Sequence, residues 1–152
     1  MLLSELLTPD RVRVPLRGDS KAALLEELVG VLRDSGAVSD ADAVLDAVLA
    51  REAVLSTGVG SGVAIPHGKS DRVPELAMVA GVTEKPVDFD ALDGAPVRLC
   101  FLLVGPESAA GQHVKALGRI SRLVRKEDVR ARLMEAPSPQ AFLDVLAEAE
   151  EA

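Results

Sequence analysis

Aromatic side chains are almost missing from this chain of 152 residues, which has no tryptophan and no tyrosine. Aromatic residues make up 2% of the sequence, yet hydrophobic residues reach 48%. The core must therefore be aliphatic, built from leucine, valine and alanine. A chain of this length is expected to form about one domain, here residues 1–150, with a sizeable core of its own.

Cysteine and histidine are equally scarce. A single cysteine, Cys100, excludes an intramolecular disulfide and a cysteine-rich metal site. It lies within the apolar run VRLCFLLV, where a small buried hydrophobe is favoured over a reactive thiol. The two histidines, His67 and His113, are far apart and lack the close ligand pairs of common zinc sites. We expect neither a metal nor another cofactor.

Basic residues are also few, since the chain has 24 acidic residues and 17 basic ones, which gives a net charge of −7. This balance argues against nucleic-acid binding and against an anionic membrane surface, both of which call for a basic face. No apolar run approaches the ~20 residues of a membrane span, so no membrane insertion is expected. The start of the chain has no basic segment, and Glu5 interrupts its apolar stretch, so the sequence favours a cytoplasmic protein.

Hydrophobic periodicity predicts an α/β fold with a mixed β-sheet flanked by helices on both faces. The most apolar run, residues 96–105, is expected to be a central strand buried on both sides. Ser39 to Asp42 predicts a capping box at a helix start. The expected strands cover residues 11–16, 62–66, 76–83 and 96–105. The expected helices cover about 20–35, from 41 to about 52, 112–125, 126–134 and 139–150.

The helix expected over 112–125 has a basic outer face formed by Lys115, Arg119, Arg122 and Arg125. On a protein surface such a charge run is favoured as a solvated face. A docking surface is the alternative interpretation.

The segment GVGSGVAIPHGKSD, residues 58–71, nearly matches three known motifs. A phosphate-binding P-loop and a dinucleotide-binding loop would both require glycine where Val63 stands. A nucleophile elbow around Ser61 would require glycine where Val59 stands. All three motifs are therefore excluded.

The same segment presents His67 between two backbone-shaping residues. Pro66 fixes the chain on one side, and Gly68 leaves the other side unobstructed. Backbone N–H groups near Gly68 are candidates to bind phosphoryl oxygens, and Lys69 adds positive charge. A neutral imidazole is a good nucleophile towards phosphorus when its other nitrogen holds the proton. This arrangement indicates a phosphohistidine, with a structural turn residue as the alternative.

The stretch REAVLSTGVGSGVAIPH, residues 51–67, resembles the active-site segment of phosphotransferase-system (PTS) enzyme IIA domains. The type is the fructose/mannitol and nitrogen-regulatory superfamily. The resemblance continues through VDFDALDGAPVRLCFLLVGP (87–106) and HVKALGRISRLV (113–124), so it covers nearly the whole chain.

The resemblance implies a phosphocarrier that accepts a phosphoryl group from the protein HPr on His67. It further implies transfer to a IIB domain, most readily for fructose-type sugar uptake, or a signalling role as in the nitrogen-regulatory branch. By motif position, the second active-site histidine is His113, the arginine is Arg51, and the Thr57 hydroxyl faces the site. The oligomeric state stays open.

Each implied role has a structural alternative. His113 can be a residue that only starts a helix, where the helix dipole would keep its ring neutral. Arg51 can pair with a nearby carboxylate. Thr57 can serve as a turn hydroxyl.

Overall fold

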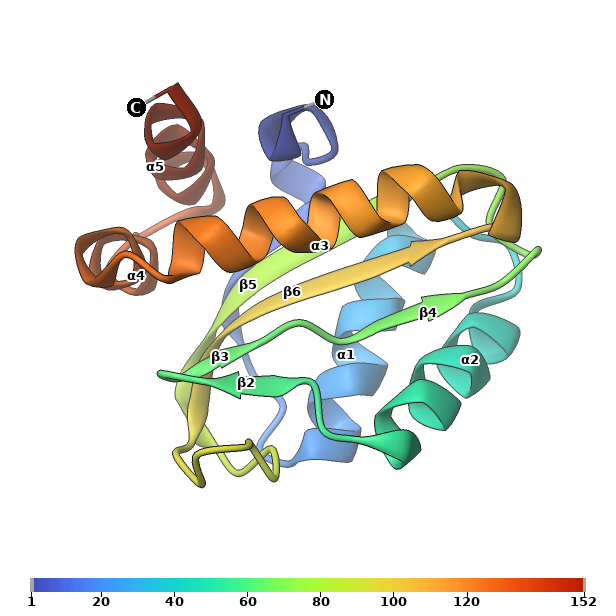
Figure 1. The fold of residues 1–152 in the computed structure, drawn as a ribbon, viewed down its shortest axis with the longest axis horizontal. Helices are drawn as coiled ribbons and strands as arrows, with labels where there is room; N and C mark the ends of the chain where they lie inside the picture. The colour runs from blue at the N-terminus through green and yellow to red at the C-terminus, as the bar shows by residue number, and fades with distance from the viewer. Residues whose placement is uncertain (1, 152) are drawn as a thin grey trace.

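The computed structural model describes residues 2–151, which form one mixed sheet between two layers of helices (Figure 1). The strands run in the order β1-β5-β6-β3-β2. β4 also pairs with β6, nearer the C-terminal end of β6 than β3 does. β1 is parallel to β5, β5 is antiparallel to β6, and β3 and β4 are both parallel to β6. The strands are β1 (Val12–Leu16), β2 (Gly58–Gly60), β3 (Val63–Ala64), β4 (His67–Lys69), β5 (Ala77–Val87) and β6 (Val97–Gly105).

Helices cover both faces of the sheet, as predicted. On one face lie α3 (Ala110–Val124), α4 (Glu127–Met134), α5 (Pro139–Glu151) and the short 3-10 turn η1 (Leu3–Glu5). On the other face lie α1 (Lys21–Asp34) and α2 (Ala41–Val54). The remaining 3-10 turns are η2 (Pro9–Arg11) and η3 (Glu107–Ala109).

The central strand β6 shows why its sequence is apolar throughout. Leu99, Phe101 and Leu103 pack into the core under α3, α4 and α5, whereas Cys100 and Leu102 pack into the core under α1 and α2. Because successive side chains of a strand point to opposite faces, a strand covered on both sides needs apolar residues at every position. Cys100 is fully buried, and burial raises the pKa of its thiol above the ordinary range.

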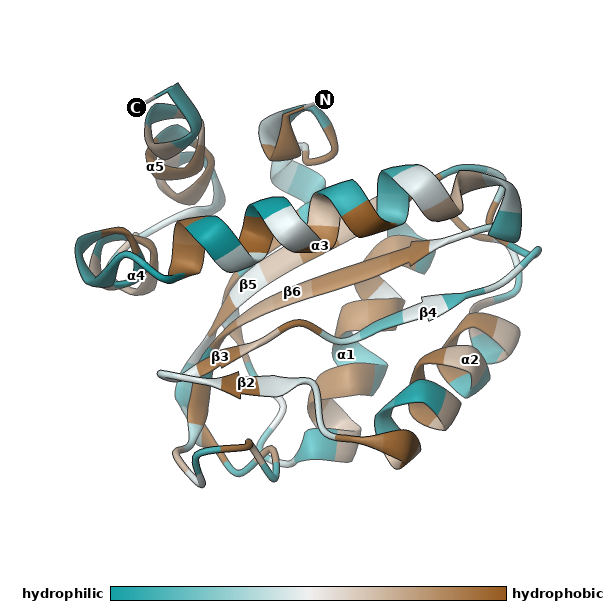
Figure 2. Ribbon diagram, in the orientation of Figure 1, coloured by the Kyte–Doolittle hydropathy of each residue, from teal (hydrophilic) through white to brown (hydrophobic). Residues whose placement is uncertain are grey.

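The helices are covered on one side only, so most of their apolar residues lie on the side that packs on the sheet (Figure 2). α3 turns its apolar side to the sheet and its polar side outward, and its outer face is visibly hydrophilic. No helix between residues 2 and 151 combines the length and the hydropathy that a membrane crossing requires.

The starts of α1, α2 and α5 are each fixed by a side-chain cap. Ser20 and Ser138 accept hydrogen bonds of 3.1 Å from Ala23 N and Ala141 N. At α2 the capping box predicted over Ser39 to Asp42 does not form, because Asp40 is the N-cap and its carboxylate accepts from Ala43 N at 3.1 Å, and Ala43 has no polar side chain to return the bond. An aspartate cap also suits the helix dipole.

The buried carboxylate of Glu150 joins the two ends of the described chain. It lies near the end of α5 with 1% of its side chain exposed and accepts hydrogen bonds from Leu3 N at 2.6 Å and Ser4 N at 2.8 Å. Arg119 Nε of α3 donates to the same carboxylate at 3.1 Å. One side chain thus holds η1, α3 and α5 together.

We expect Glu150→Ala to lower the free energy of unfolding by about 2 kcal/mol, because it leaves charge-assisted donors without their acceptor. Glu148→Ala is the matched control, since Glu148 forms an exposed pair with Arg132 and should cost less than about 0.5 kcal/mol. Urea unfolding of both variants measures the difference. Equal losses in the two variants would contradict the role given to Glu150.

Candidate functional site

His67 is the first residue of β4, and its ring is half-buried. Its Nδ1 lies 2.9 Å from the carbonyl oxygen of Ile65. A carbonyl oxygen can only accept a hydrogen bond, so Nδ1 must carry the ring proton of the neutral imidazole. The lone pair is therefore on Nε2, which becomes the nucleophilic atom of this ring.

His113 from α3 meets His67 edge to face. The ring centroids are 5.6 Å apart, and the ring planes are inclined by 70°. His113 is 3% exposed, and in the chain from residue 2 to 151 its two ring nitrogens are the buried side-chain polar atoms without a hydrogen-bond partner. Because unpaired buried polar groups are costly, these nitrogens are the ring atoms available to hydrogen-bond a polar group that binds beside His67.

Burial, with smaller contributions from His67 and Lys69, lowers the pKa of His113 to about 4. The ring is therefore neutral near pH 7. The sequence predicts this neutral state from a position at a helix start, but α3 begins at Ala110 and His113 lies inside its first turn on the buried side. Desolvation rather than the helix dipole is the main cause.

This buried ring predicts a loss of stability in acid. The pKa of histidine in the unfolded chain is about 6.5, and folding lowers it to about 4. The unfolded state therefore binds more protons as pH falls between these values, so the stability that is present above pH 6.5 is lost. From pH 7 to 4.5 we expect this ring to cost about 2 kcal/mol of unfolding free energy.

Urea unfolding at both pH values, on wild type and on His113→Leu, tests this expectation. Leucine fills a similar volume and does not titrate, so its variant should lose about 2 kcal/mol less than wild type over the same range. Parallel losses in the two proteins would show that His113 is not the group responsible.

Thr57 takes part in a buried network, whereas the family resemblance implies a hydroxyl that faces the site. Its N–H donates to Glu52 Oε1 at 2.9 Å and its hydroxyl donates to Glu52 Oε2 at 2.5 Å. Lys21 Nζ lies 2.7 Å from the same carboxylate. Burial acts to raise the pKa of Glu52, but the hydrogen bonds from Lys21 and Thr57 outweigh it and hold the pKa below its ordinary value. The Thr57 hydroxyl proton is thus committed to Glu52.

A series of hydrogen bonds connects this network to His67. The Thr57 carbonyl accepts from Ile65 N at 2.9 Å, and the Ile65 carbonyl accepts from His67 Nδ1 at 2.9 Å. Glu52 therefore fixes the strand segment whose carbonyl selects the tautomer of His67.

Gly68 and Lys69 differ in what they offer to an anion. Ser70 N donates to Gly105 O of β6 at 3.0 Å, and alternate N–H groups of a strand point to the same side. The Gly68 N–H thus points to β6, whereas the N–H groups of His67 and Lys69 point away from it. Gly68 also allows close packing, since a Cβ there would lie 3.1 Å from Val48 N of α2. The Lys69 ammonium is half-exposed, 3.8 Å from the Glu107 carboxylate.

Arg51 lies in the last turn of α2. Its guanidinium donates to the carbonyl of Leu55 at 2.9 Å and so caps the end of the helix. Within residues 2–151 it forms no ion pair, so the local carboxylate pair that the sequence left open is not found. The structure brings His67, His113 and Lys69 into one neighbourhood, whereas Arg51 and Thr57 belong to the connection from α2 to β2.

Glu52 is the residue that the sequence analysis missed. Val44, Val48 and Glu52 are the buried residues of α2 and follow each other at intervals of four. A charged residue at a position that the helical pattern assigns to the core is the signal that would have identified it, because buried carboxylates need partners. Among residues 2–151 no three His, Cys, Asp or Glu side chains gather in a way that would hold a metal ion.

Comparison with known proteins identifies the family of this chain. The family described as phosphoenolpyruvate-dependent sugar phosphotransferase system, EIIA 2, matches residues 5–149. A fructose-specific EIIA component of Haloferax volcanii is 41% identical over 129 residues, which are 85% of this chain and 84% of that protein. A fructose-specific EIIABC component of Bacillus subtilis is 36% identical over 146 residues, 96% of this chain, but this chain spans only 23% of its length.

Among solved structures, the nitrogen regulatory protein IIA-Ntr of Neisseria meningitidis superposes with a TM-score of 0.87 at 35% identity. The match covers 95% of this chain and 98% of that one. The family match over residues 5–149, the relative at 41% identity and the shared fold show that this chain belongs to the EIIA type 2 family of the phosphoenolpyruvate-dependent sugar phosphotransferase system.

Proposed function

We propose that the protein carries a phosphoryl group on Nε2 of His67, accepted from HPr and passed to a IIB domain for fructose-type sugar uptake. The observation that carries this proposal is the hydrogen bond from His67 Nδ1 to the Ile65 carbonyl. It leaves the Nε2 lone pair free and presents it beside the neutral, unpartnered ring of His113.

In the transfer, the Nε2 lone pair forms the new bond to phosphorus while the phosphorus–nitrogen bond of the donor breaks. The bonding electron pair returns to the donor imidazole. The proton stays on His67 Nδ1, hydrogen-bonded to the Ile65 carbonyl oxygen, so no general base is needed. The onward transfer to IIB reverses these roles, with His67 as the leaving group.

The surrounding groups stabilise the phosphoryl oxygens. His113 donates its ring N–H, Lys69 supplies positive charge, and the outward N–H groups beside Gly68 supply backbone donors. Arg51 caps the end of α2 and is not among the groups gathered around His67, so the site role that the resemblance implies for it stays a prediction. Thr57 acts through Glu52, by fixing the segment that orients His67.

A signalling role of the nitrogen-regulatory kind is the second candidate. It is supported by the superposition on IIA-Ntr, which spans nearly the full length of both chains. In that role the phosphorylation state of His67 governs binding to partners outside sugar transport.

The test measures intact mass after incubation with phosphoenolpyruvate, enzyme I and HPr, followed by addition of a fructose-type IIB domain. Uptake of one acid-labile phosphoryl group and its rapid transfer to IIB would support the transport role. Uptake without transfer would favour the regulatory role. No uptake, with the upstream proteins shown to be active, would overturn both.

A further inference from the structure

The outer face of α3 carries a stripe of basic side chains that the phosphoryl site does not use. We call Lys115, Arg119, Arg122 and Lys126 the basic stripe. The first three lie within about 60° of each other around the helix and extend for about 10 Å along it, and Lys126 follows directly after the helix ends. His113 lies on the opposite side of α3, towards the sheet.

The stripe is not neutralised by the protein itself. Within residues 2–151, no ion pair or side-chain hydrogen bond involves the side chains of Lys115, Arg122 or Lys126. Arg119 is bound to Glu150 through Nε alone, which leaves its two terminal amino groups available. The chain as a whole has a net charge of −7, so this group of unpaired cations is a local exception to its acidic composition.

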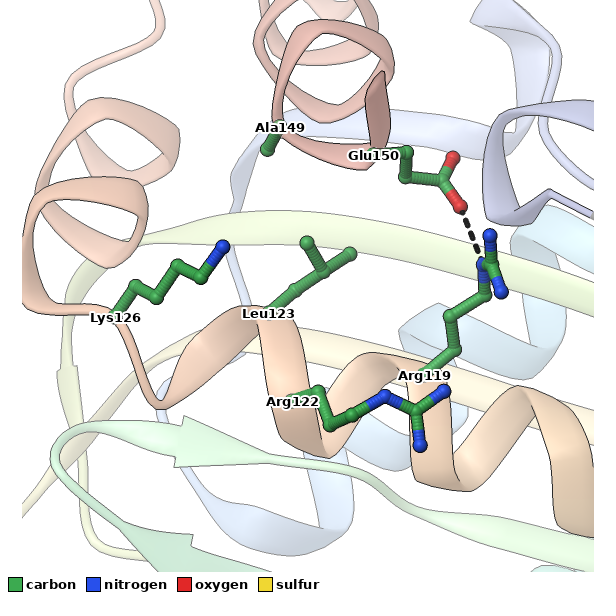
Figure 3. Close-up of a pocket in the computed structure, with 6 residues that line it drawn as sticks. All are labelled: Arg119, Arg122, Leu123, Lys126, Ala149 and Glu150. Atoms are coloured by element: carbon green, nitrogen blue, oxygen red, sulfur yellow. Dashed lines mark hydrogen bonds and ion pairs between the residues drawn. The ribbon is translucent and has the colours of Figure 1, made fainter. Parts of the chain in front are cut away.

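The stripe borders two adjoining hollows that share Arg119 and Arg122. One, of about 250 Å³, lies between Arg119, Arg122 and Lys126, and the buried residues Leu123 and Ala149 lie beneath it. Figure 3 shows Leu123 lying between Lys126 on one side and the two arginines on the other, with Glu150 holding Arg119. The second, of about 510 Å³, continues along α3 past Lys115 and the exposed side chain of Val114.

We propose that the basic stripe docks an acidic segment of a partner protein that also carries an apolar side chain. The cations select carboxylates, and the exposed Val114 side chain beside the second hollow offers a place for the apolar group. A small anion would leave this apolar surface and the second hollow unused. Lys115, Arg119 and Arg122 of the basic face favoured from sequence as solvated thereby belong to a docking surface. Arg125, the fourth residue of that face, lines a different hollow beside Ser61.

Docking there leaves the phosphoryl site open, because His113 and the stripe lie on opposite sides of α3. Binding at the stripe is therefore separable from uptake of a phosphoryl group by His67, and its test does not depend on the proposed function.

The probe is a 15-residue fluorescent peptide with glutamates along one face and a central leucine, titrated at low and at physiological salt. We compare wild type with Arg122→Glu/Lys126→Glu. The matched control is Arg33→Glu/Lys85→Glu, which makes the same change in net charge on other surfaces. We expect about tenfold weaker binding for the stripe variant and less than about twofold for the control. The amide signals of α3 should shift in the NMR spectrum of wild type.

Equal weakening in both variants would overturn the proposal, because it would show attraction by net charge alone. Pyrophosphate or a DNA duplex that shifts the same α3 signals with equal or higher affinity would overturn it in favour of a small-anion or nucleic-acid site. A peptide with alanine in place of leucine should bind several-fold more weakly. Unchanged binding of that peptide would remove the role of the apolar surface and with it the proposed class of partner.

Discussion

His67→Gln is expected to take up no phosphoryl group from phosphorylated HPr, whereas wild type takes up one. Glutamine has no nucleophilic ring nitrogen, and His113 cannot replace it because its ring is 3% exposed. His113→Gln should still be phosphorylated, about 100-fold more slowly, because it loses a donor to the phosphoryl oxygens but keeps the nucleophile. Intact mass at timed intervals, before and after mild acid, measures both variants.

The comparison depends on both variants being folded, which urea unfolding at pH 7 establishes. An acid-labile adduct on His67→Gln at the wild-type rate would contradict the assignment of the carrier residue. An adduct on wild type that NMR assigns to Nδ1 of His67 would contradict the tautomer that the Ile65 carbonyl imposes.

Glu52→Ala is expected to combine a large loss of stability with a slower phosphoryl uptake. Removing this carboxylate leaves the Lys21 ammonium and the Thr57 donors without their acceptor, which should cost about 3 kcal/mol. The Ile65 carbonyl then no longer holds one orientation, and phosphoryl uptake should fall about tenfold. Urea unfolding and the initial rate of mass increase measure the two effects.

A readout of positioning separates this role from a loss of stability alone. The ¹⁵N chemical shifts of the His67 ring report which nitrogen carries the proton, and wild type should show a proton on Nδ1. Glu52→Ala should show a mixture of tautomers. Glu52→Gln keeps an acceptor for Thr57 N and should stay close to wild type. A single Nδ1–H tautomer in all three proteins would refute the positioning role.

Much of the fold could be predicted because its core elements have strong hydrophobic periods. The continuous apolar run of β6 and the helical spacing of α1 and α3 follow directly from burial. β2 and β4 were missed, because these segments of three residues contain glycine and no alternating pattern. β3 is two residues long where a strand of five residues, 62–66, was expected. Their pairing with β6 or with each other, rather than local propensity, makes them strands.

The site was predictable only in part, for a similar reason. The sequence around His67 carries local signals, since proline and glycine flank the ring. The approach of His113 depends on how α3 crosses the sheet, which no local pattern encodes, and its expected role came from family resemblance. The tautomer of His67 and the part played by Thr57 depend on the Ile65 carbonyl and on Glu52, which the fold brings together.

The attachment of Glu150 to Leu3 and Ser4 places both ends of the described chain at one corner of the molecule (Figure 1). A domain tethered before residue 2 and another tethered after residue 151 would therefore leave this protein from neighbouring points. Short linkers would suffice to hold both at high local concentration on the same side. The same closeness makes the protein suited to circular permutation, since a short bridge could join its ends without crossing the sheet.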